Sequence, residues 1–413
     1  MKKILLLLAI LILGNNVFAQ LDNNNLAIDE LSGKITDGAR IISTGVPLLI
    51  IAPDARSGSM GDIGAASTPD ANSIHWNAAK LAFMDKEAGV SFTYSPWLRE
   101  IVSDIELLYL GSYFKLNERS TLGASLTYFS LGAIDFFDQE GMSTGTYKPN
   151  EFAVDLAYTM KLNNNLAISL TGRYIRSDLT QGQNVGTTQT HAANAGAADL
   201  GVYYQKAIKA VRPTEIALGA QISNLGSKIS YSENMDSEFL PANLRIGGRY
   251  SMDLDQFNEI SFMMDFNKLL VPTPPVYDST GNIYAGLDPE VGVFQGAIQS
   301  FYDAPNGFKE EIQEISLSLG AEYWYNKVLA VRAGYFYEAK NKGARQYLTL
   351  GAGIKYNVMG LDISYLIATG QLNNNPLKNT LRVGLSFDLQ SDKQKETNGA
   401  TQKDPQQSLE TKS

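Results

Sequence analysis

Few residues of this chain are of a type that performs chemistry. It has no cysteine and two histidines, His75 and His191. The missing cysteines exclude disulfides, thiolate zinc sites, iron–sulfur clusters and cysteine nucleophiles. His75 stands beside Trp76 without further metal-ligand types near it, and His191 lies among Thr, Gln and Asn. We therefore predict no catalytic residue, no metal site and no cofactor.

A glycine-rich stretch offers a second chemical possibility, a phosphate cradle. Gly58-Ser-Met-Gly61-Asp-Ile-Gly64 has suitable spacing, but no Lys-Ser/Thr follows it and no strand–helix–strand unit surrounds it. Small residues also let a chain pack closely against a neighbour. We favour this packing interpretation.

Charged residues near these glycines suggest an anchoring role. Semi-buried ion pairs can hold a segment in register against its surroundings. The candidates are Asp54, Arg56 and Asp70, with Arg173, Glu322 and Arg382 as possible partners farther along the chain.

Composition limits the class of protein. The 413 residues are 44% hydrophobic and 19% charged, with a formal charge of −9. The hydrophobic share excludes a wholly disordered chain. The acidic balance argues against nucleic acid as a partner, since binders of nucleic acid normally show a basic surface.

The N-terminus has the pattern of a secretory signal. Lys2 and Lys3 precede an unbroken apolar run over 4–13, and Val17-Phe18-Ala19 suits cleavage after Ala19. We predict a signal peptide over 1–19. No later stretch of 18 apolar residues could form a transmembrane helix.

Most of the remaining chain alternates between apolar and polar residues. In 315–325 the odd positions are Ile, Leu, Leu, Ala, Tyr and Tyr, and the even positions are Ser, Ser, Gly, Glu and Trp. Period two indicates a strand with one apolar face, and its terminal tyrosines suit a membrane interface. The same template predicts about fourteen strands, near 88–94, 105–116, 120–131, 151–161, 166–176, 194–205, 214–223, 242–250, 258–267, 315–325, 329–338, 347–356, 360–367 and 380–389.

The lengths of strands and links favour a membrane barrel. Most predicted strands have about nine to twelve residues, as a tilted strand needs to cross a bilayer, whereas strands of soluble proteins average five or six. Links alternate between short, Asn-rich turns and long loops, as in outer-membrane barrels with short periplasmic turns and long external loops. A soluble β-protein is the alternative, but it has no reason to sort its links by side. The short links are 117–119, 162–165, 326–328 and 357–359, and the long ones 132–150, 177–193, 224–241 and 268–314.

These patterns divide the chain into four parts. A transmembrane antiparallel β-barrel occupies 88–389, and its last strand resembles the terminal signal of outer-membrane proteins. A barrel of this strand number is too wide for its own side chains to fill, so we predict that 20–87 forms a periplasmic or plug segment. The polar residues 390–413 read as a disordered tail.

The whole mature chain, most densely in its first hundred residues, resembles the PorV family of the Bacteroidetes type IX secretion system, which is similar to the FadL-like group of fourteen-stranded, plugged barrels. One departure is Asn77-Ala-Ala, where the FadL-like group usually has Asn-Pro-Ala. The stretches that carry the resemblance are Pro47–Arg56, Gly61–Gly64, Pro69–Asn72, His75–Asn77 and Ser95–Arg99. The plug motif that they imply consists of Pro53, Asp54, Arg56, Gly61, Gly64, Asp70, Trp76 and Asn77.

The resemblance implies a non-enzymatic function in the outer membrane of a Gram-negative, Bacteroidetes-type bacterium. A PorV-like protein associates with the SprA-type translocon and binds the C-terminal signal domain of secreted cargo. It then shuttles the cargo to the PorU-type attachment complex. Outer-membrane lipid and lipopolysaccharide would surround the barrel.

Candidate contact residues lie in the predicted external loops, where aromatic residues and arginine are common anchors of interfaces. A tryptophan there could instead belong to the aromatic girdle of the barrel. The candidates are Pro96, Trp97, Leu98, Arg99, Phe136, Phe137, Pro274, Tyr277, Phe294, Phe301 and Tyr302.

Two other functions remain open from the sequence. One is a FadL-type transporter of hydrophobic small molecules. It would need a continuous apolar pocket from the external loops to a lateral gap in the wall. The other is an outer-membrane enzyme acting on lipopolysaccharide, such as a deacylase. The sequence has no Ser–His spacing signature, so this alternative would need a site built from carboxylates.

Overall fold

The structure is a computed structural model. Among the residues that it describes, no helix is both long and apolar enough to cross a membrane. The described ranges are 40–96, 104–137, 141–182, 184–185, 188–232, 237–369 and 380–389.

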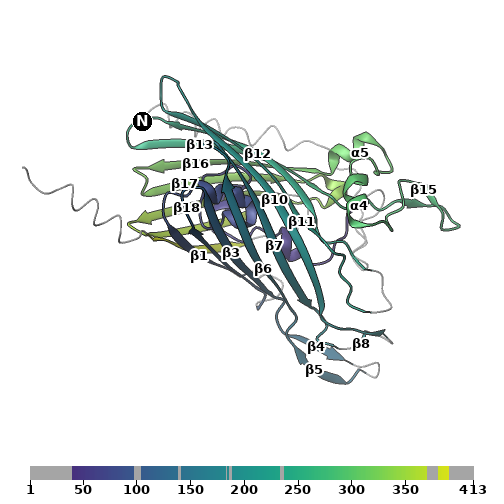
Figure 1. Cartoon of the computed structure of the whole chain (residues 1–413). Coiled ribbons are helices and arrows are strands. Elements are labelled where there is room, and N and C mark those ends of the chain that lie inside the picture. Colours follow the sequence, from purple (N-terminus) through teal and green to yellow (C-terminus); the bar gives the residue numbers. More distant parts are fainter. Residues whose placement is uncertain are drawn as a thin grey trace, which may run out of the picture. The chain divides into compact units, whose positions relative to one another are not determined.

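Within these ranges, fourteen antiparallel strands close into one barrel (Figure 1). Closure is complete because β1 pairs with β20 in continuous register from Ala88↔Leu389 to Tyr94↔Val383. The predicted barrel is therefore confirmed, and each predicted strand occurs with its ends shifted by at most a few residues. In order around the barrel the strands are β1 (Ala88–Pro96), β2 (Glu106–Lys115), β3 (Ser120–Ser130), β6 (Asn150–Lys161), β7 (Leu166–Asp178), β10 (Ala193–Ile208), β11 (Thr214–Gly226), β12 (Asn243–Asp253), β13 (Asn258–Leu269), β16 (Ile315–Tyr325), β17 (Leu329–Tyr337), β18 (Gln346–Tyr356), β19 (Met359–Ala368) and β20 (Leu381–Leu389).

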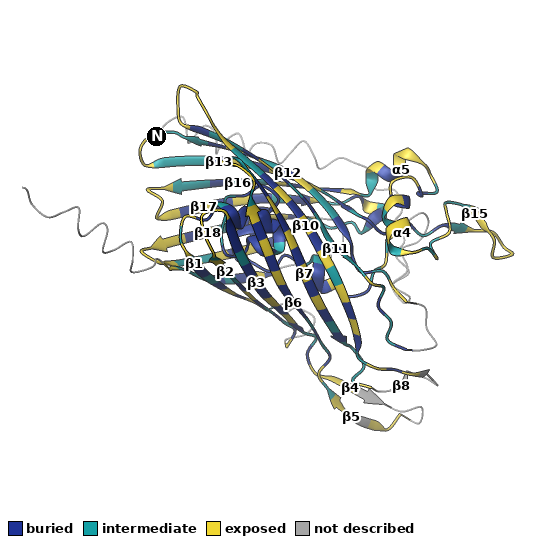
Figure 2. Ribbon diagram, in the orientation of Figure 1, coloured by how far each residue is buried: buried dark blue, intermediate teal, exposed yellow. Residues whose placement is uncertain are grey.

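Burial alternates along each strand, as period two requires. On β16, Ser318 and Glu322 are buried inside the barrel, whereas Leu319 is exposed on the outer wall. Figure 2 shows the same alternation of dark blue and yellow along β3, β6 and β7. Apolar side chains thus face outward and polar ones line the lumen, which is the reverse of a soluble barrel.

The two ends of the barrel differ in their links. One end, called the short-turn end, has tight turns in which Asn326, Lys327 and Asn357 adopt positive φ, a conformation that asparagine tolerates. Asn117 Oδ1 accepts from the backbone N–H of Arg119 at 2.8 Å and stabilises another of these turns.

The opposite end, called the long-loop end, carries links with secondary structure of their own (Figure 1). From the sequence we predicted these links as long loops, because strands of two to five residues are too short to show the period-two alternation. The elements are the hairpins β4 (Ile134–Phe137) with β5 (Ser143–Tyr147), β8 (Asn184–Val185) with β9 (Thr188–Gln189), and β14 (Val276–Tyr277) with β15 (Ile283–Ala285), the helices α4 (Val293–Gln299) and α5 (Phe308–Gln313), and the 3-10 turn η4 (Lys340–Lys342).

Residues 40–87, called the inner segment, run through the barrel from end to end. Arg40 N–H donates to Asn341 O at the long-loop end at 3.0 Å, and Met84 O accepts from Lys115 Nζ at the short-turn end at 2.7 Å. Figure 1 shows the helices of this segment inside the ring of strands. They are η2 (Pro47–Ile50), α2 (Ala55–Gly58), α3 (Ser73–Asn77) and η3 (Ala78–Phe83).

The main buried cores form between the inner segment and the wall. Leu48 and Leu49 pack with Ile105 and Leu107 near the long-loop end, and Ile74 and Leu81 pack with Tyr109 nearer the middle. The division into a signal peptide, a plug, a barrel and a tail stays a prediction, and 1–39 and 390–413 lie outside the described residues.

Candidate functional site

The glycines of the inner segment seat its backbone directly on the wall. Gly61 N–H donates to Thr349 Oγ1 at 2.8 Å, and Gly64 N–H donates to Asp265 Oδ2 at 2.7 Å. Gly61 has φ +71°, and a Cβ there would lie 2.8 Å from the Tyr335 carbonyl oxygen. The wall also has glycines where it meets the inner segment. A Cβ on Gly334 would lie 2.0 Å from the Met60 carbonyl carbon, so no larger residue fits there. These glycines therefore serve close packing, and no phosphate cradle is needed to explain them.

Arg56 ties the inner segment to the wall through a buried network. Its guanidinium donates to both carboxylate oxygens of Glu322, at 3.0 and 2.9 Å, and to Asp70 Oδ2 at 2.9 Å. Arg332 donates to Glu322 from the neighbouring strand at 2.7 Å and to Asp362 at 2.6 Å. Of the pairings considered from sequence, the structure brings together Arg56 and Glu322.

The other suggested partners are engaged elsewhere. Arg173 pairs with Asp155 at 2.6 Å and Asp199 at 3.2 Å, both on the wall. Asp54 does not pair with a distant arginine. It caps α2 by accepting from Ser57 N–H at 2.8 Å, a local role that acidic residues commonly take.

Trp76 and Asn77 fix the middle of the inner segment. Trp76 is buried, donates from Nε1 to Asp54, and stacks under the Arg245 guanidinium at 4.4 Å from the ring centre. Asn77 Nδ2 donates to Ala65 O at 3.0 Å and to Val202 O on the wall at 2.9 Å. Pro53 is buried just before Asp54. All eight residues of the predicted plug motif thus lie within the barrel, and none is arranged to react with a substrate.

A cavity of about 520 Å³ lies between the inner segment and the long-loop end. Its lining combines apolar residues such as Ile50 and Phe336 with charged ones such as Arg245, Glu338 and Arg345. It is therefore a mixed polar space, unlike the continuous apolar channel expected of a transporter for hydrophobic compounds.

The link between β13 and β16, called loop 270–314, presents most of the exposed aromatic residues at the long-loop end. The predicted candidates Tyr277, Phe294, Phe301 and Tyr302 have exposed fractions of 55, 74, 50 and 63%. Pro274 is half-buried. The structure adds exposed apolar residues that the sequence analysis missed, namely Tyr284, Ile298, Phe308 and Ile312. Their signal was the i, i+4 spacing of Phe294 with Ile298 and of Phe308 with Ile312, which marks one face of a helix.

The structure describes the remaining candidate contact residues only in part. Pro96 ends β1, and Trp97, Leu98 and Arg99 lie outside the described residues. Phe136 and Phe137 lie in the β4–β5 hairpin at the same end, where only the backbone is described.

Buried charges clamp loop 270–314 to the rim. Glu310 of α5 accepts from Arg40 at 2.8 and 2.6 Å and from Lys342 Nζ at 2.7 Å. Glu314 accepts from Lys268 Nζ at 2.7 Å and from Lys342 Nζ at 2.8 Å. Burial alone would raise the pKa of Glu310, but the hydrogen bonds from Arg40 and Lys342 hold it at about 2.

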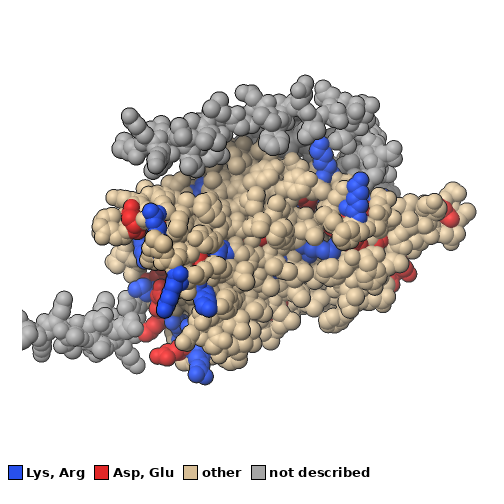
Figure 3. Space-filling model, turned by 90° about the horizontal axis from the view of Figure 1, so that it is seen from above, with Lys and Arg blue, Asp and Glu red and all other residues tan. Residues whose placement is uncertain are grey.

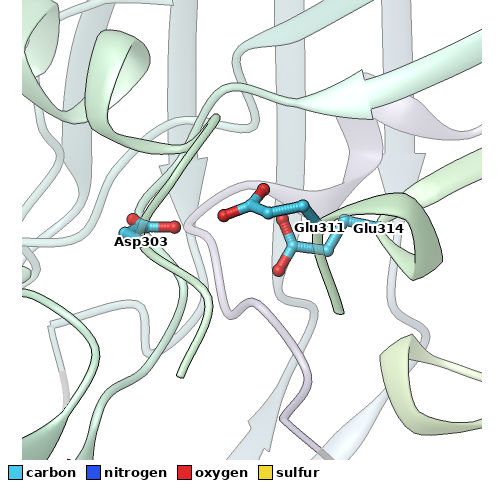
Figure 4. Close-up of side chains that lie close together, drawn as sticks. All are labelled: Asp303, Glu311 and Glu314. Carbon is cyan, nitrogen blue, oxygen red and sulfur yellow. The ribbon is translucent and has the colours of Figure 1, made fainter. Parts of the chain in front are cut away.

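Asp303, Glu311 and Glu314 form a buried group of carboxylates within this loop (Figure 4). Their ligand atoms lie within 4.8 Å of one another. Lys268 Nζ, however, lies 3.1 Å from Glu311 and 2.7 Å from Glu314, so lysine already supplies the positive charge. Burial raises the pKa of Asp303 to about 6, and the charges of Glu311 and Glu314 add to the effect. The group is explained as part of the clamp.

Comparison with solved structures places similar barrels beside this one. They include the Ralstonia pickettii toluene transporter TbuX, at 14% identity over 81% of this chain and 96% of that one, with a TM-score of 0.41. The Pseudomonas putida toluene transporter TodX has 13% identity over 84% of this chain and 99% of that one, with a TM-score of 0.46. Identities this low carry no information about what this chain binds.

Curated proteins gave no match to the chain. The family model described as "Type IX secretion system protein PorV" matches residues 34–276, more than half of the chain. Members of this family act in secretion and are not enzymes, and the closed barrel with its apolar outer wall fits their place in the outer membrane of Gram-negative bacteria. The chain belongs to the PorV family of the type IX secretion system and is one of its outer-membrane β-barrel proteins.

Proposed function

We propose that this protein binds the C-terminal signal domains of secreted cargo at an SprA-type translocon and shuttles them to a PorU-type attachment complex at the cell surface. The observation that carries the proposal is the set of exposed aromatic side chains on loop 270–314, held on a rigid rim by the Glu310 and Glu314 clamp. Long loops of outer-membrane barrels face the cell exterior. Cargo emerging there would meet this surface first.

Rigidity supports binding as much as exposure does. Aromatic side chains bury large areas at little cost in conformational entropy, and they dominate the energetics of many interfaces. A loop that is already fixed by buried ion pairs loses less entropy on binding than a free one.

The proposal is tested by recovering cargo from native membranes. Phe294→Ala and Tyr302→Ala should each reduce the amount of cargo signal domain that copurifies with the protein in mild detergent. Tyr356→Ala is the matched control, since Tyr356 is 78% exposed but lies at the short-turn end. Equal recovery of cargo by all three variants would contradict the proposed site.

The transporter alternative has less support. The cavity at the long-loop end is charged as well as apolar, and the wall pairs around its full circumference. Binding of a long-chain fatty acid to the purified barrel, with secretion unaffected by loss of the protein, would favour that alternative.

A further inference from the structure

The outer wall of the barrel has a groove that the proposed function does not use. A hollow of about 810 Å³ extends over β11, β12, β13, β16, β17 and β18. Its floor is formed where small residues replace the usual bulky ones, at Gly248, Ala321 and Ala333. Gly248 lies opposite Leu218 and Met264 on the neighbouring strands, and these longer side chains form the sides.

The groove continues toward the long-loop end. A second hollow of about 230 Å³ shares Ile246 and Phe266 with the first and reaches Phe308 and Ile312 of α5. Together the two hollows form a mainly apolar path from the middle of the wall to α5, and Lys268 and Glu311 lie at its upper end. The larger hollow alone is within the range of about 300–1,000 Å³ that is typical of sites for small-molecule ligands.

The surroundings of the groove decide what can fill it. Figure 3 shows a broad area of uncharged wall between charged residues nearer the ends. Arg249 is the one charged residue lining the larger hollow, and it points into the lumen, where it donates to Ala66 O at 3.0 Å. Because this wall faces the hydrocarbon layer of the outer membrane, any occupant must be apolar at this depth.

Shape favours a lipid chain over another protein. The outer wall of a neighbouring barrel is broad and convex, so it would rest on the flanking Leu218 and Met264 and leave the floor at Gly248 empty. A flexible acyl chain can follow the floor past Gly248. The upper end of the groove lies under α5, where Lys309, next to Phe308, is exposed. A basic residue at this level suits a phosphate-bearing headgroup.

We infer that this groove binds an acyl chain of lipopolysaccharide, with a headgroup phosphate near Lys309. The smaller hollow is lined by Phe301, Phe308 and Ile312 of loop 270–314, whereas no residue of this loop lines the larger one. Lipid binding in the larger hollow therefore stands whether or not the loop binds cargo. A lipid held here would rest against the underside of α5 and help to fix the height of the loop above the membrane.

Filling the floor tests the inference. A Cβ on Gly248 would lie 3.5 Å from Leu218 Cδ2, an ordinary contact, so Gly248→Leu should fold and occupy the groove. Gly172→Leu is the matched control, because Gly172 lies in the middle of β7, is exposed, and has nothing within 4 Å of its Cβ position. Heat-modifiable mobility on gels confirms that both barrels are closed.

The full-length protein in detergent is mixed with purified lipopolysaccharide or with phosphatidylethanolamine, and bound lipid is counted by native mass spectrometry. We expect Gly248→Leu to raise the dissociation constant for lipopolysaccharide at least about tenfold and Gly172→Leu to leave it unchanged. Lys309→Gln should weaken binding of lipopolysaccharide more than binding of phosphatidylethanolamine, because the phosphate of phosphatidylethanolamine is neutralised by its own ammonium group. Equal lipopolysaccharide binding by the wild type and Gly248→Leu would overturn the site. Stronger binding of phosphatidylethanolamine than of lipopolysaccharide would overturn the assignment of the lipid. A protein that copurifies with the wild type and is lost only in Gly248→Leu would show that the groove is a protein interface.

Discussion

The side chains of Trp76 and Arg56 each connect the inner segment to the wall of the barrel. Trp76 connects the α2 cap, through Asp54, to the wall, through Arg245. Arg56 neutralises Glu322 and Asp70 at once, in a place where the side chain of Glu322 is 2% exposed. Buried ions of this kind stabilise only while every partner is present. The contacts of Trp76 and Arg56 therefore determine where the inner segment lies in the lumen.

Replacing Arg56 tests this dependence. Arg56→Ala leaves the carboxylate of Glu322 with Arg332 alone and should destabilise the docked inner segment by about 3–5 kcal/mol. Lys355→Ala breaks a more exposed pair with Asp388, whose lysine side chain is 47% exposed, and should cost at most about 1 kcal/mol. Thermal unfolding in detergent, with trypsin cleavage of the inner segment as a second measurement, distinguishes the two. Equal shifts would show that the Arg56 network contributes no more than a surface pair.

Glu310 gives the clamp a dependence on pH. Its pKa is about 2 when folded, against an ordinary value of 4.5. A lowered carboxyl pKa contributes stability that is present above pH 4.5 and is lost as pH falls toward 2. Protection factors for amide hydrogen exchange in loop 270–314, which are corrected for the intrinsic change of exchange rate with pH, should therefore fall between pH 4.5 and 2.5.

Two variants check the sign of this effect. Glu310→Gln should exchange faster at pH 7 and lose the dependence. Asp303 has the opposite shift, to about 6, so Asp303→Asn should slow exchange at pH 7 rather than speed it. Protection factors that are constant from pH 7 to 2.5 in the wild type would exclude the role given to Glu310.

At the scale of elements, small residues determine how the inner segment and the wall meet. The inward positions Gly320 and Gly334, paired across β16 and β17, let the backbone of Met60 approach the wall. A strand interior normally disfavours glycine, and here close approach of another backbone supplies the reason.

A methyl group at this seat should displace the inner segment without opening the barrel. Gly334→Ala places a Cβ 2.0 Å from the Met60 carbonyl carbon, and overpacking of this kind costs about 1–3 kcal/mol. Gly172→Ala, at a position with open space around it, should have no effect. Protease access to the inner segment, measured beside heat-modifiable mobility, separates displacement from unfolding. If the inner segment of Gly334→Ala were as resistant to protease as that of the wild type, close packing at Gly334 would not hold the inner segment in place.

For the whole molecule, the main question is whether the inner segment stays in place during secretion. It contacts strands around most of the wall, from β3 to β20, and its anchors are buried. We expect the inner segment to act as a static plug and the long-loop end to bind cargo.

The absence of cysteine permits a direct test of this expectation. A Cβ built on Gly384 would lie 3.5 Å from Ala55 Cβ, at the short end of the range for a disulfide. Oxidising the Ala55→Cys, Gly384→Cys double variant should lock the inner segment to β20, and secretion should continue at its normal rate. Each single variant is the control. Loss of secretion on oxidation, restored by a reductant, would show that the inner segment must move.

The sequence by itself determined the fold and which links between strands are short or long, because both depend on local patterns. Period-two alternation marks each strand, as in Ile315–Tyr325, and link length sorts the two ends. It also indicated the outer membrane and, through stretches such as Gly61–Gly64, the PorV family. Tertiary structure alone decided which distant residues meet. Arg56 with Glu322, Gly334 with Met60, and α5 with Arg40 are hundreds of positions apart, and no local pattern encodes such pairings. The groove at Gly248 is likewise a property of six strands side by side, since a single glycine in a strand says nothing of its neighbours until closure of the barrel supplies them.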